Sequence, residues 1–123
     1  MSARLLLVDD DIGQLRMLAR LISLRKHDLT VLTASDGFQA LDIIGSKKCD
    51  MVVTDIQMPN MDGLTLTKNI KTQYRYLQIP VILVSSMGSD EDKAKGLESG
   101  ADAYIVKKDL SQRELIETIE QLL

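Results

Sequence analysis

The sequence predicts an α/β fold in which five parallel strands form one sheet and five helices cover both of its faces. Two observations support this prediction. Five short apolar segments alternate along the chain with segments whose apolar residues recur at helical spacing. The short segments are apolar at nearly every position, which is typical of parallel strands buried on both faces. With 123 residues, the chain is expected to form one domain covering residues 1–123.

The predicted strands are short and are bounded by polar or turn-forming residues. They cover residues 4–8, 29–34, 51–55, 80–84 and 103–106. Pro80 would be the first residue of its strand. Proline is tolerated there because its missing N–H is not needed for a hydrogen bond to the neighbouring strand. Parallel strands need crossover connections, and these connections are right-handed.

The predicted helices follow polar residues that can cap a helix N-terminus. Asp11 with Gln14, Asp36 with Gln39, Ser89 with Asp92 and Ser111 with Glu114 have the spacing of a capping box. The pair Asp62-Gly63 leads into the third helix, and Gly45 is expected to end the second.

The fourth predicted helix, residues 90–99, has little apolar surface to bury. Ala94 and Leu97 are expected to face the core, and Gly96 lies inside the helix, where glycine costs about 1 kcal/mol relative to alanine. Low apolar burial marks a segment of low local stability. We therefore expect either a thin, solvated helix or an element that shifts when the functional site changes.

Composition excludes several classes of protein. The net charge of −3 and the pI of about 5.1 argue against a nucleic-acid-binding surface. A single cysteine, Cys49, excludes an internal disulfide and a multi-cysteine metal site. No apolar segment is long enough for a membrane helix or a signal peptide, so a cytoplasmic location is expected. The single histidine, His27, is expected to be a solvated loop residue.

Polar side chains stand where four of the predicted strands end. Asp9 and Asp10 follow the first strand, Asp55 ends the third, and Ser85 and Lys107 follow the fourth and fifth. Parallel strands bring their carboxyl ends to one edge of a sheet, where ligands of open α/β sheets bind. Each residue alone could be a helix cap or a solvated side chain, but the joint pattern favours one site.

The chemistry of this group indicates phosphoryl transfer. Clustered carboxylates repel one another unless a cation neutralises them, and an all-oxygen ligand set favours Mg²⁺. A carboxylate beside a metal and a lysine can attack phosphorus and form an aspartyl phosphate. Mg²⁺ would take one phosphoryl oxygen, Lys107 a second, and Ser85 with backbone N–H groups the third.

The sequence resembles the receiver domain of two-component response regulators, of which the chemotaxis regulator CheY is the simplest form. The resemblance covers nearly the whole chain. The matching residues follow the predicted elements. They are 6–10 around the end of the first strand; 36, 37, 40 and 41 at the start of the second helix; 55, 58, 59, 62 and 63 from the end of the third strand onward; 80–82 and 85 in and directly after the fourth strand; and 100–104 and 107 around the fifth.

The resemblance implies a flavodoxin-like three-layer sandwich with strand order 2-1-3-4-5. It implies that Asp55 is phosphorylated by a histidine kinase or phosphotransfer domain. Mg²⁺, with Mn²⁺ as a substitute, would be held by Asp10, Asp55 and the backbone carbonyl of Gln57, with Asp9 acting through water.

The resemblance also implies a switch. Ser85 and Tyr104 would change position on phosphorylation and reshape the face formed by the fourth helix, fifth strand and fifth helix, where a downstream protein would bind. No direct nucleic-acid or membrane binding is expected. The chain would be a signalling module and not an enzyme, catalysing only its own phosphorylation and dephosphorylation.

The chain departs from the family pattern at several positions. Lys108 replaces the proline that usually follows the strand-five lysine, so a trans Lys107–Lys108 bond is expected. Ser86 stands where alanine is frequent. Gln57 and Met87 occupy positions that influence phosphoryl hydrolysis in the family.

Other classes of protein fit less well. A haloacid-dehalogenase-type phosphatase would need a second aspartate where Gln57 stands, and a flavodoxin-type FMN carrier would need a Ser/Thr-rich loop where residues 9–11 are aspartates. Two alternatives stay open: a phosphorylation-independent pseudo-receiver that acts as an adaptor, and a receiver domain cut from a hybrid histidine kinase.

Overall fold

A single five-stranded parallel sheet forms the centre of the protein, in the order β2-β1-β3-β4-β5. The computed structural model describes residues 3–109 and 111–123; residues 1, 2 and 110 of the predicted domain lie outside the described residues. The strands are β1 (Ala3–Val8), β2 (Leu29–Ala34), β3 (Met51–Asp55), β4 (Val81–Ser85) and β5 (Ala103–Val106). The predicted fold class and strand order are confirmed.

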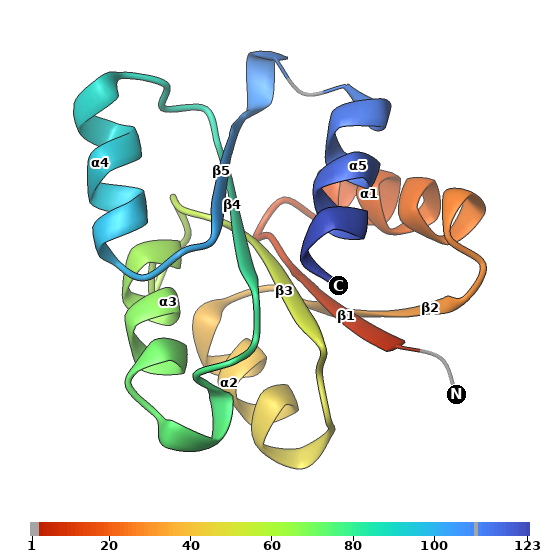
Figure 1. Ribbon diagram of the computed structural model, residues 1–123, viewed down its shortest axis with the longest axis horizontal. Helices are drawn as coiled ribbons and strands as arrows, with labels where there is room; N and C mark the ends of the chain where they lie inside the picture. The colour runs from red at the N-terminus through yellow and green to blue at the C-terminus, as the bar shows by residue number, and fades with distance from the viewer. Residues whose placement is uncertain (1–2, 110) are drawn as a thin grey trace.

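Helices cover both faces of this sheet, as Figure 1 shows. One face packs against α1 and α5, and the other faces α2, α3 and α4. The helices are α1 (Ile12–Arg25), α2 (Gly37–Ser46), α3 (Gly63–Lys71), α4 (Asp90–Glu98) and α5 (Gln112–Leu122), with short 3₁₀ turns at Tyr74–Tyr76 and Lys107–Asp109.

The core consists of two large layers and one small cluster. Leu5 and Leu7 of β1 point to the α1/α5 layer, whereas Leu6 and Val8 point to the α2/α3 layer, because successive strand side chains alternate between faces. All four are at most 1% exposed. A strand that is buried on both faces must be apolar throughout, which explains the segments seen in the sequence.

The predicted helix starts are confirmed by capping hydrogen bonds. Asp11, Asp36 and Ser111 each accept the backbone N–H of the residue three positions on, and Ser89 forms a reciprocal capping box with Asp92. These bonds satisfy N–H groups that have no partner within the helix. The helices therefore begin where the sequence predicts.

Several predicted boundaries were wrong by one residue, among them the end of α2 and the start of β4. Gly45 does not end α2: the helix continues to Ser46, and Lys47 is its C-cap. Only Gly100 among the described glycines has a positive φ, so Gly45 does not adopt the left-handed conformation that ends many helices. Pro80 precedes β4, which begins at Val81, although the Pro80 carbonyl still accepts the Val52 N–H.

The prediction that Ala94 and Leu97 face the core from α4 was wrong. Both residues are exposed, and the buried residue of this helix is Gly96. A Cβ atom at Gly96 would lie 2.6 Å from Cδ2 of Tyr104, so α4 meets the sheet through the one residue without a side chain. The expectation of a thin helix holds, but with a different contact residue.

The connection from β5 to α5 agrees with expectation. The Lys107–Lys108 peptide bond is trans. His27 is exposed, as expected of a loop residue. Among the described residues, no helix is both long enough and apolar enough to cross a membrane.

Candidate functional site

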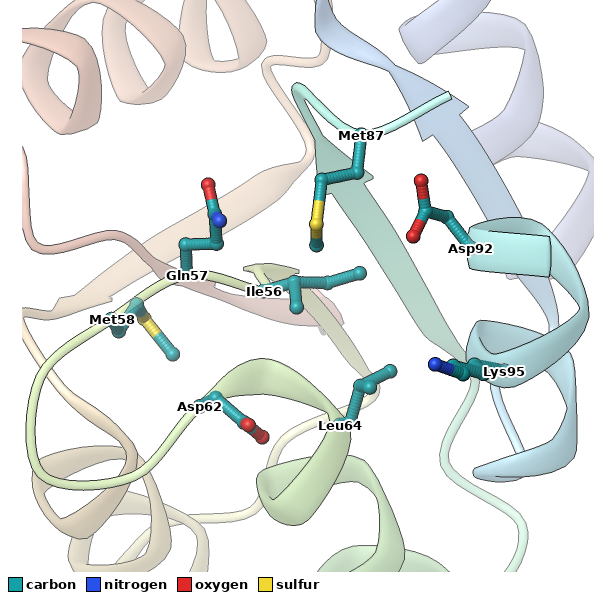
Figure 2. A pocket seen from close by; sticks show the side chains of 8 residues that line it. All are labelled: Ile56, Gln57, Met58, Asp62, Leu64, Met87, Asp92 and Lys95. Atoms are coloured by element: carbon teal, nitrogen blue, oxygen red, sulfur yellow. The ribbon is translucent and has the colours of Figure 1, made fainter. Parts of the chain in front are cut away.

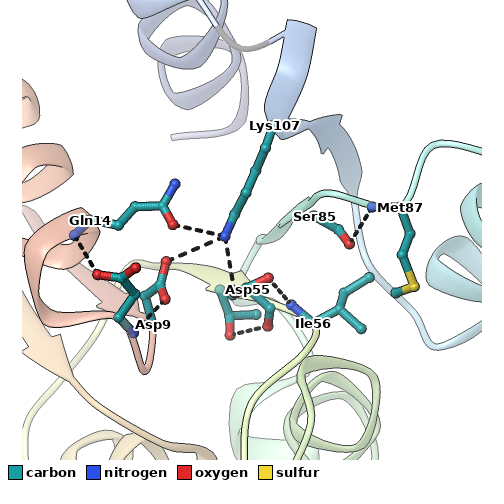
Figure 3. A network of polar contacts seen from close by, with 9 residues as sticks. Asp9, Gln14, Asp55, Ile56, Ser85, Met87 and Lys107 are labelled. Atoms are coloured by element: carbon teal, nitrogen blue, oxygen red, sulfur yellow. Dashed lines mark hydrogen bonds and ion pairs between the residues drawn. The ribbon is translucent and has the colours of Figure 1, made fainter.

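The side chains of Asp9, Asp55 and Lys107 meet at the carboxyl edge of the sheet, and Ser85 lies at the same edge and bonds to Met87 (Figure 3). Each comes from the end of a different strand: β1, β3, β4 and β5. These are the neighbouring strands of the sheet, so their ends are adjacent in space. The sequence-based expectation that these residues lie together agrees with their positions.

Asp55 is buried at the centre of this group, with 8% of its surface exposed. Its Oδ1 accepts the Ile56 N–H at 2.7 Å, and its Oδ2 accepts a hydrogen bond from Lys107 Nζ at 3.0 Å. A buried carboxylate requires such partners, because an unpaired charge in the interior is costly. The carboxylate is thereby fixed in one orientation.

Lys107 makes contacts with three side chains. Its Nζ lies 3.0 Å from Oδ2 of Asp55 and 3.7 Å from Oδ2 of Asp9, and it donates to Oε1 of Gln14 at 2.9 Å. Figure 3 shows the lysine reaching from the end of β5 toward both carboxylates. One ammonium thus partly neutralises two buried carboxylates.

Three carboxylates form a cluster that could hold a cation. One oxygen from each of Asp9, Asp10 and Asp55 lies within 4.8 Å of the others. Asp9 is 3% exposed and its Oδ1 accepts the Asp11 N–H at 2.9 Å, whereas Asp10 is exposed. Burial raises the pKa of Asp9 above its usual value, although the Asp11 N–H and the Lys107 charge act in the opposite direction. An all-oxygen set of this kind suits a hard divalent cation.

Ser85 and Tyr104 are connected through the backbone of Met87. Ser85 is fully buried, and its Oγ accepts the Met87 N–H at 3.1 Å. The Tyr104 hydroxyl donates to the Met87 carbonyl at 2.7 Å. The loop between β4 and α4 therefore ties the hydroxyl at the end of β4 to the aromatic ring on β5.

Comparison with known families matches residues 5–120 to the response regulator receiver domain. The chain belongs to this family. It is 39% identical over 119 residues to the gliding motility regulatory protein of Myxococcus xanthus, a match that covers 97% of this chain and 15% of that protein. The chain spans between 15% and 49% of the lengths of five curated relatives that it matches.

Solved receiver structures have the same fold. Chemotaxis protein CheY4 of Vibrio cholerae is 29% identical, with a TM-score of 0.89 and full coverage of both chains. Response regulator protein TrrA of Thermotoga maritima, solved in complex with Mg²⁺ and BeF, is 28% identical, with a TM-score of 0.83 and coverage of 98% of this chain and 99% of that one. Receiver domains are signalling modules of two-component systems and not classical enzymes.

The side-chain contact of Gln14 is not predicted by the sequence pattern. The pattern predicts Gln14 only as part of a helix cap, and its N–H does donate to Asp11 Oδ1 at 3.1 Å. Its side chain, however, points away from the cap and accepts from Lys107. The cap places Gln14 in the first turn of α1, beside the strand ends. This position in the sequence is the feature that could have indicated a contact with the site. Gln57 is exposed at the start of the β3–α3 loop.

Proposed function

We propose that this receiver domain accepts a phosphoryl group on Asp55 and uses it to switch a protein-binding face. The observation that carries the proposal is the position of Lys107 Nζ, 3.0 Å from Asp55 Oδ2, at the edge of the Asp9, Asp10 and Asp55 cluster. A fixed carboxylate, a cation and an adjoining oxygen-ligand cluster are the groups that phosphoryl transfer to a carboxylate requires.

The proposed cofactor is Mg²⁺, for which Mn²⁺ would substitute. The carboxylates of Asp10 and Asp55 and the backbone carbonyl of Gln57 would be direct ligands, and Asp9 would act through water. The three aspartate oxygens within 4.8 Å of one another support this assignment, because both ions prefer oxygen ligands. When bound, the ion neutralises the cluster and stabilises negative charge on the phosphoryl oxygens.

The phosphoryl group would be transferred directly from the donor to Asp55 and later removed by water. An Asp55 oxygen would attack the phosphorus of a phosphohistidine that is protonated on its other ring nitrogen. The P–N bond breaks and the nitrogen keeps the bonding electron pair, so a neutral imidazole leaves. Lys107 compensates charge that moves onto the phosphoryl oxygens. Hydrolysis would end the signal: water attacks the phosphorus, the bond to the Asp55 oxygen breaks, and the free carboxylate and inorganic phosphate remain.

Ser85 and Tyr104 would transmit the change. Once Asp55 carries a phosphoryl group, the Ser85 side chain would rotate toward it and donate its hydroxyl proton to a phosphoryl oxygen, and this change of rotamer would break the bond between Ser85 Oγ and the Met87 N–H. The Met87 carbonyl accepts a hydrogen bond from the Tyr104 hydroxyl. A shift of the loop between β4 and α4 would therefore break this bond and free the tyrosine ring. The affected face consists of α4, β5 and α5, and a downstream protein would bind there.

The proposal also covers organisation and partners. Residues 1–123 would form one receiver domain whose phosphoryl donor is a histidine kinase or phosphotransfer domain, and which catalyses only its own phosphorylation and dephosphorylation. The free, buried thiol of Cys49 suits the reducing cytoplasm. With a net charge of −3, direct binding of the receiver domain to nucleic acid is not expected.

Incubation with acetyl phosphate and MgCl₂, followed by intact mass measurement, tests the proposal. One phosphoryl adduct should form, and it should be absent in Asp55→Asn and in EDTA. Asp28→Asn, at an exposed position distant from the site in sequence, serves as the matched control and should be phosphorylated normally. Absence of the adduct in the wild-type protein would favour the pseudo-receiver alternative.

A further inference from the structure

A cavity of about 480 Å³ opens between α4 and the β3–α3 loop (Figure 2). Four apolar side chains form its inner wall: Ile56, Met58, Leu64 and Met87. Small-molecule sites in proteins usually have volumes of ~300–1,000 Å³, with mostly apolar walls and a few polar groups. The cavity has both properties, and its apolar wall includes two flexible methionines that can adapt to a ligand.

Charged groups surround the mouth of this cavity. Asp62 lies at the start of α3 with its carboxylate turned toward that helix, and Asp92 and Lys95 lie on the opposite side, on α4 (Figure 2). The two carboxylates accept hydrogen bonds from the backbone N–H groups of Thr65 and Ser89 at the starts of their helices. Lys95 lies 3.3 Å from Glu91, which offsets its positive charge. The mouth therefore favours a cation over an anion.

We propose that this cavity binds a compact aromatic molecule carrying one positive charge, and that binding opposes phosphorylation of Asp55. The second half of this inference rests on the proposed function. An aromatic body would pack on the apolar wall, and the cationic group would lie near the carboxylates of Asp62 and Asp92.

Two wall residues link the cavity to the phosphorylation site. The N–H of Ile56 donates to Asp55 Oδ1 at 2.7 Å, and the N–H of Met87 donates to Ser85 Oγ at 3.1 Å. Ile56 also belongs to a small buried cluster against which Leu64, Met87 and Tyr104 pack. Ile56 and Met87 would therefore touch the ligand with their side chains, while their backbone N–H groups bond to Asp55 and Ser85 of the phosphorylation site.

This arrangement couples the two sites with a definite sign. A ligand packed on Met87 favours the loop position in which the Met87 N–H is bonded to Ser85. Phosphorylation, as proposed above, requires Ser85 to leave that bond. The ligand and the phosphoryl group therefore stabilise different positions of one loop, so the bound ligand opposes phosphorylation and phosphorylation lowers the affinity for the ligand.

Binding is tested with benzamidine and with benzoate, which is similar in size but negatively charged. The six methionine methyl groups, labelled with ¹³C, report the titration by NMR. Benzamidine should give saturable shifts of the Met58 and Met87 signals, with half-saturation near ~1 mM as expected of a ligand with few atoms. Benzoate should give much weaker binding. No saturable shift, or equal binding of both compounds, would overturn the proposal.

Variants locate the bound compound. Leu64→Phe should place a ring across the apolar wall, block the bound position and abolish the shifts, whereas Leu97→Phe, at a 53% exposed position on α4, should leave them unchanged. If Leu64→Phe does not fold, Lys95→Ala gives an independent answer: removing the competing cation should tighten benzamidine binding, and Lys93→Ala, outside the cavity lining, should not.

The alternative position for benzamidine is the aspartate cluster itself. Binding that persists in Leu64→Phe, or that is lost in Asp55→Asn, would place the compound there and overturn the proposal. Binding that persists in Asp55→Asn and in the presence of MgCl₂ supports the cavity.

The coupling is measured as the initial rate of phosphorylation by acetyl phosphate. Saturating benzamidine should slow the wild-type reaction at least about fivefold and leave Leu64→Phe unaffected. Binding without any slowing would overturn the coupling. If no adduct forms even without benzamidine, the proposed function fails, while the methyl shifts still decide whether the cavity binds the cation.

Discussion

Replacing Asp55 with asparagine is expected to stabilise the fold when no divalent cation is bound. The substitution removes one of two buried carboxylates while keeping nearly the same shape and an oxygen that can accept the Ile56 N–H. Removal of one partner from a buried ion pair usually destabilises a protein, because the other charge is left alone. Here Lys107 keeps Asp9, at 3.7 Å, and the Gln14 amide oxygen, at 2.9 Å, as partners.

The distances give the size of the effect. The attraction between Lys107 and Asp55 at 3.0 Å is worth about 5.5 kcal/mol at an effective dielectric constant of ~20. At the largest separation of 4.8 Å within the cluster, each repulsion from Asp9 or Asp10 is worth about 3.5 kcal/mol, reduced for the exposed Asp10 by solvent.

The Coulomb terms therefore nearly cancel, and the desolvation of the buried Asp55 charge decides the sign. We expect the free energy of unfolding to rise by roughly 1–3 kcal/mol, which corresponds to an increase in melting temperature of about 3–10 °C.

Thermal unfolding in EDTA measures this effect. Asp28→Asn, which removes the same charge at an exposed position, is the control and should change the melting temperature little. Adding MgCl₂ should stabilise the wild type more than Asp55→Asn, because the variant lacks one cation ligand. A melting temperature of Asp55→Asn in EDTA at or below that of the wild type would refute this account of the cluster.

Three further predictions concern other parts of the fold. Gln14→Leu removes one acceptor from Lys107 and should slow phosphorylation by acetyl phosphate roughly three- to tenfold, measured as initial rates. Gly63→Ala would place a Cβ atom against the backbone oxygen of Asp55, so urea unfolding should show a loss of more than about 3 kcal/mol; a loss below about 1 kcal/mol would contradict this contact. Cys49 is 5% exposed and burial raises the pKa of its thiol, so a thiol reagent at neutral pH should react slowly with the folded protein and rapidly in denaturing urea.

The fold could be predicted from the sequence because its strongest determinants are local. Strands buried on both faces leave apolar segments, and helix starts leave capping residues such as Asp11 and Ser89. Helix ends are harder to predict, because a glycine such as Gly45 ends a helix only where the chain turns into a left-handed conformation. Tertiary packing, and not composition, made Gly96 the buried residue of α4.

The candidate site could be predicted in part for a similar reason. Parallel strands bring their ends to one edge, so Asp9, Asp55, Ser85 and Lys107 could be grouped from their positions alone. The contact between Lys107 and Gln14 could not, because it joins residues 93 positions apart through two flexible side chains. The rotamers of such side chains depend on packing around them and leave no periodic signal in the sequence.

The stabilising contacts of α4 lie mostly within the helix itself, and its buried contact with the sheet is made by Gly96. The capping box of Ser89 and Asp92, the acidic first turn and the Glu91–Lys95 ion pair all lie within the helix and stabilise it wherever it sits. Its attachment to the sheet, by contrast, depends on a glycine packed against the Tyr104 ring. Because the attachment buries so little side-chain surface, a turn of that ring can displace α4 while the internal hydrogen bonds of the helix remain intact. We expect this weak attachment to let α4 carry the change proposed at Asp55 to a binding partner.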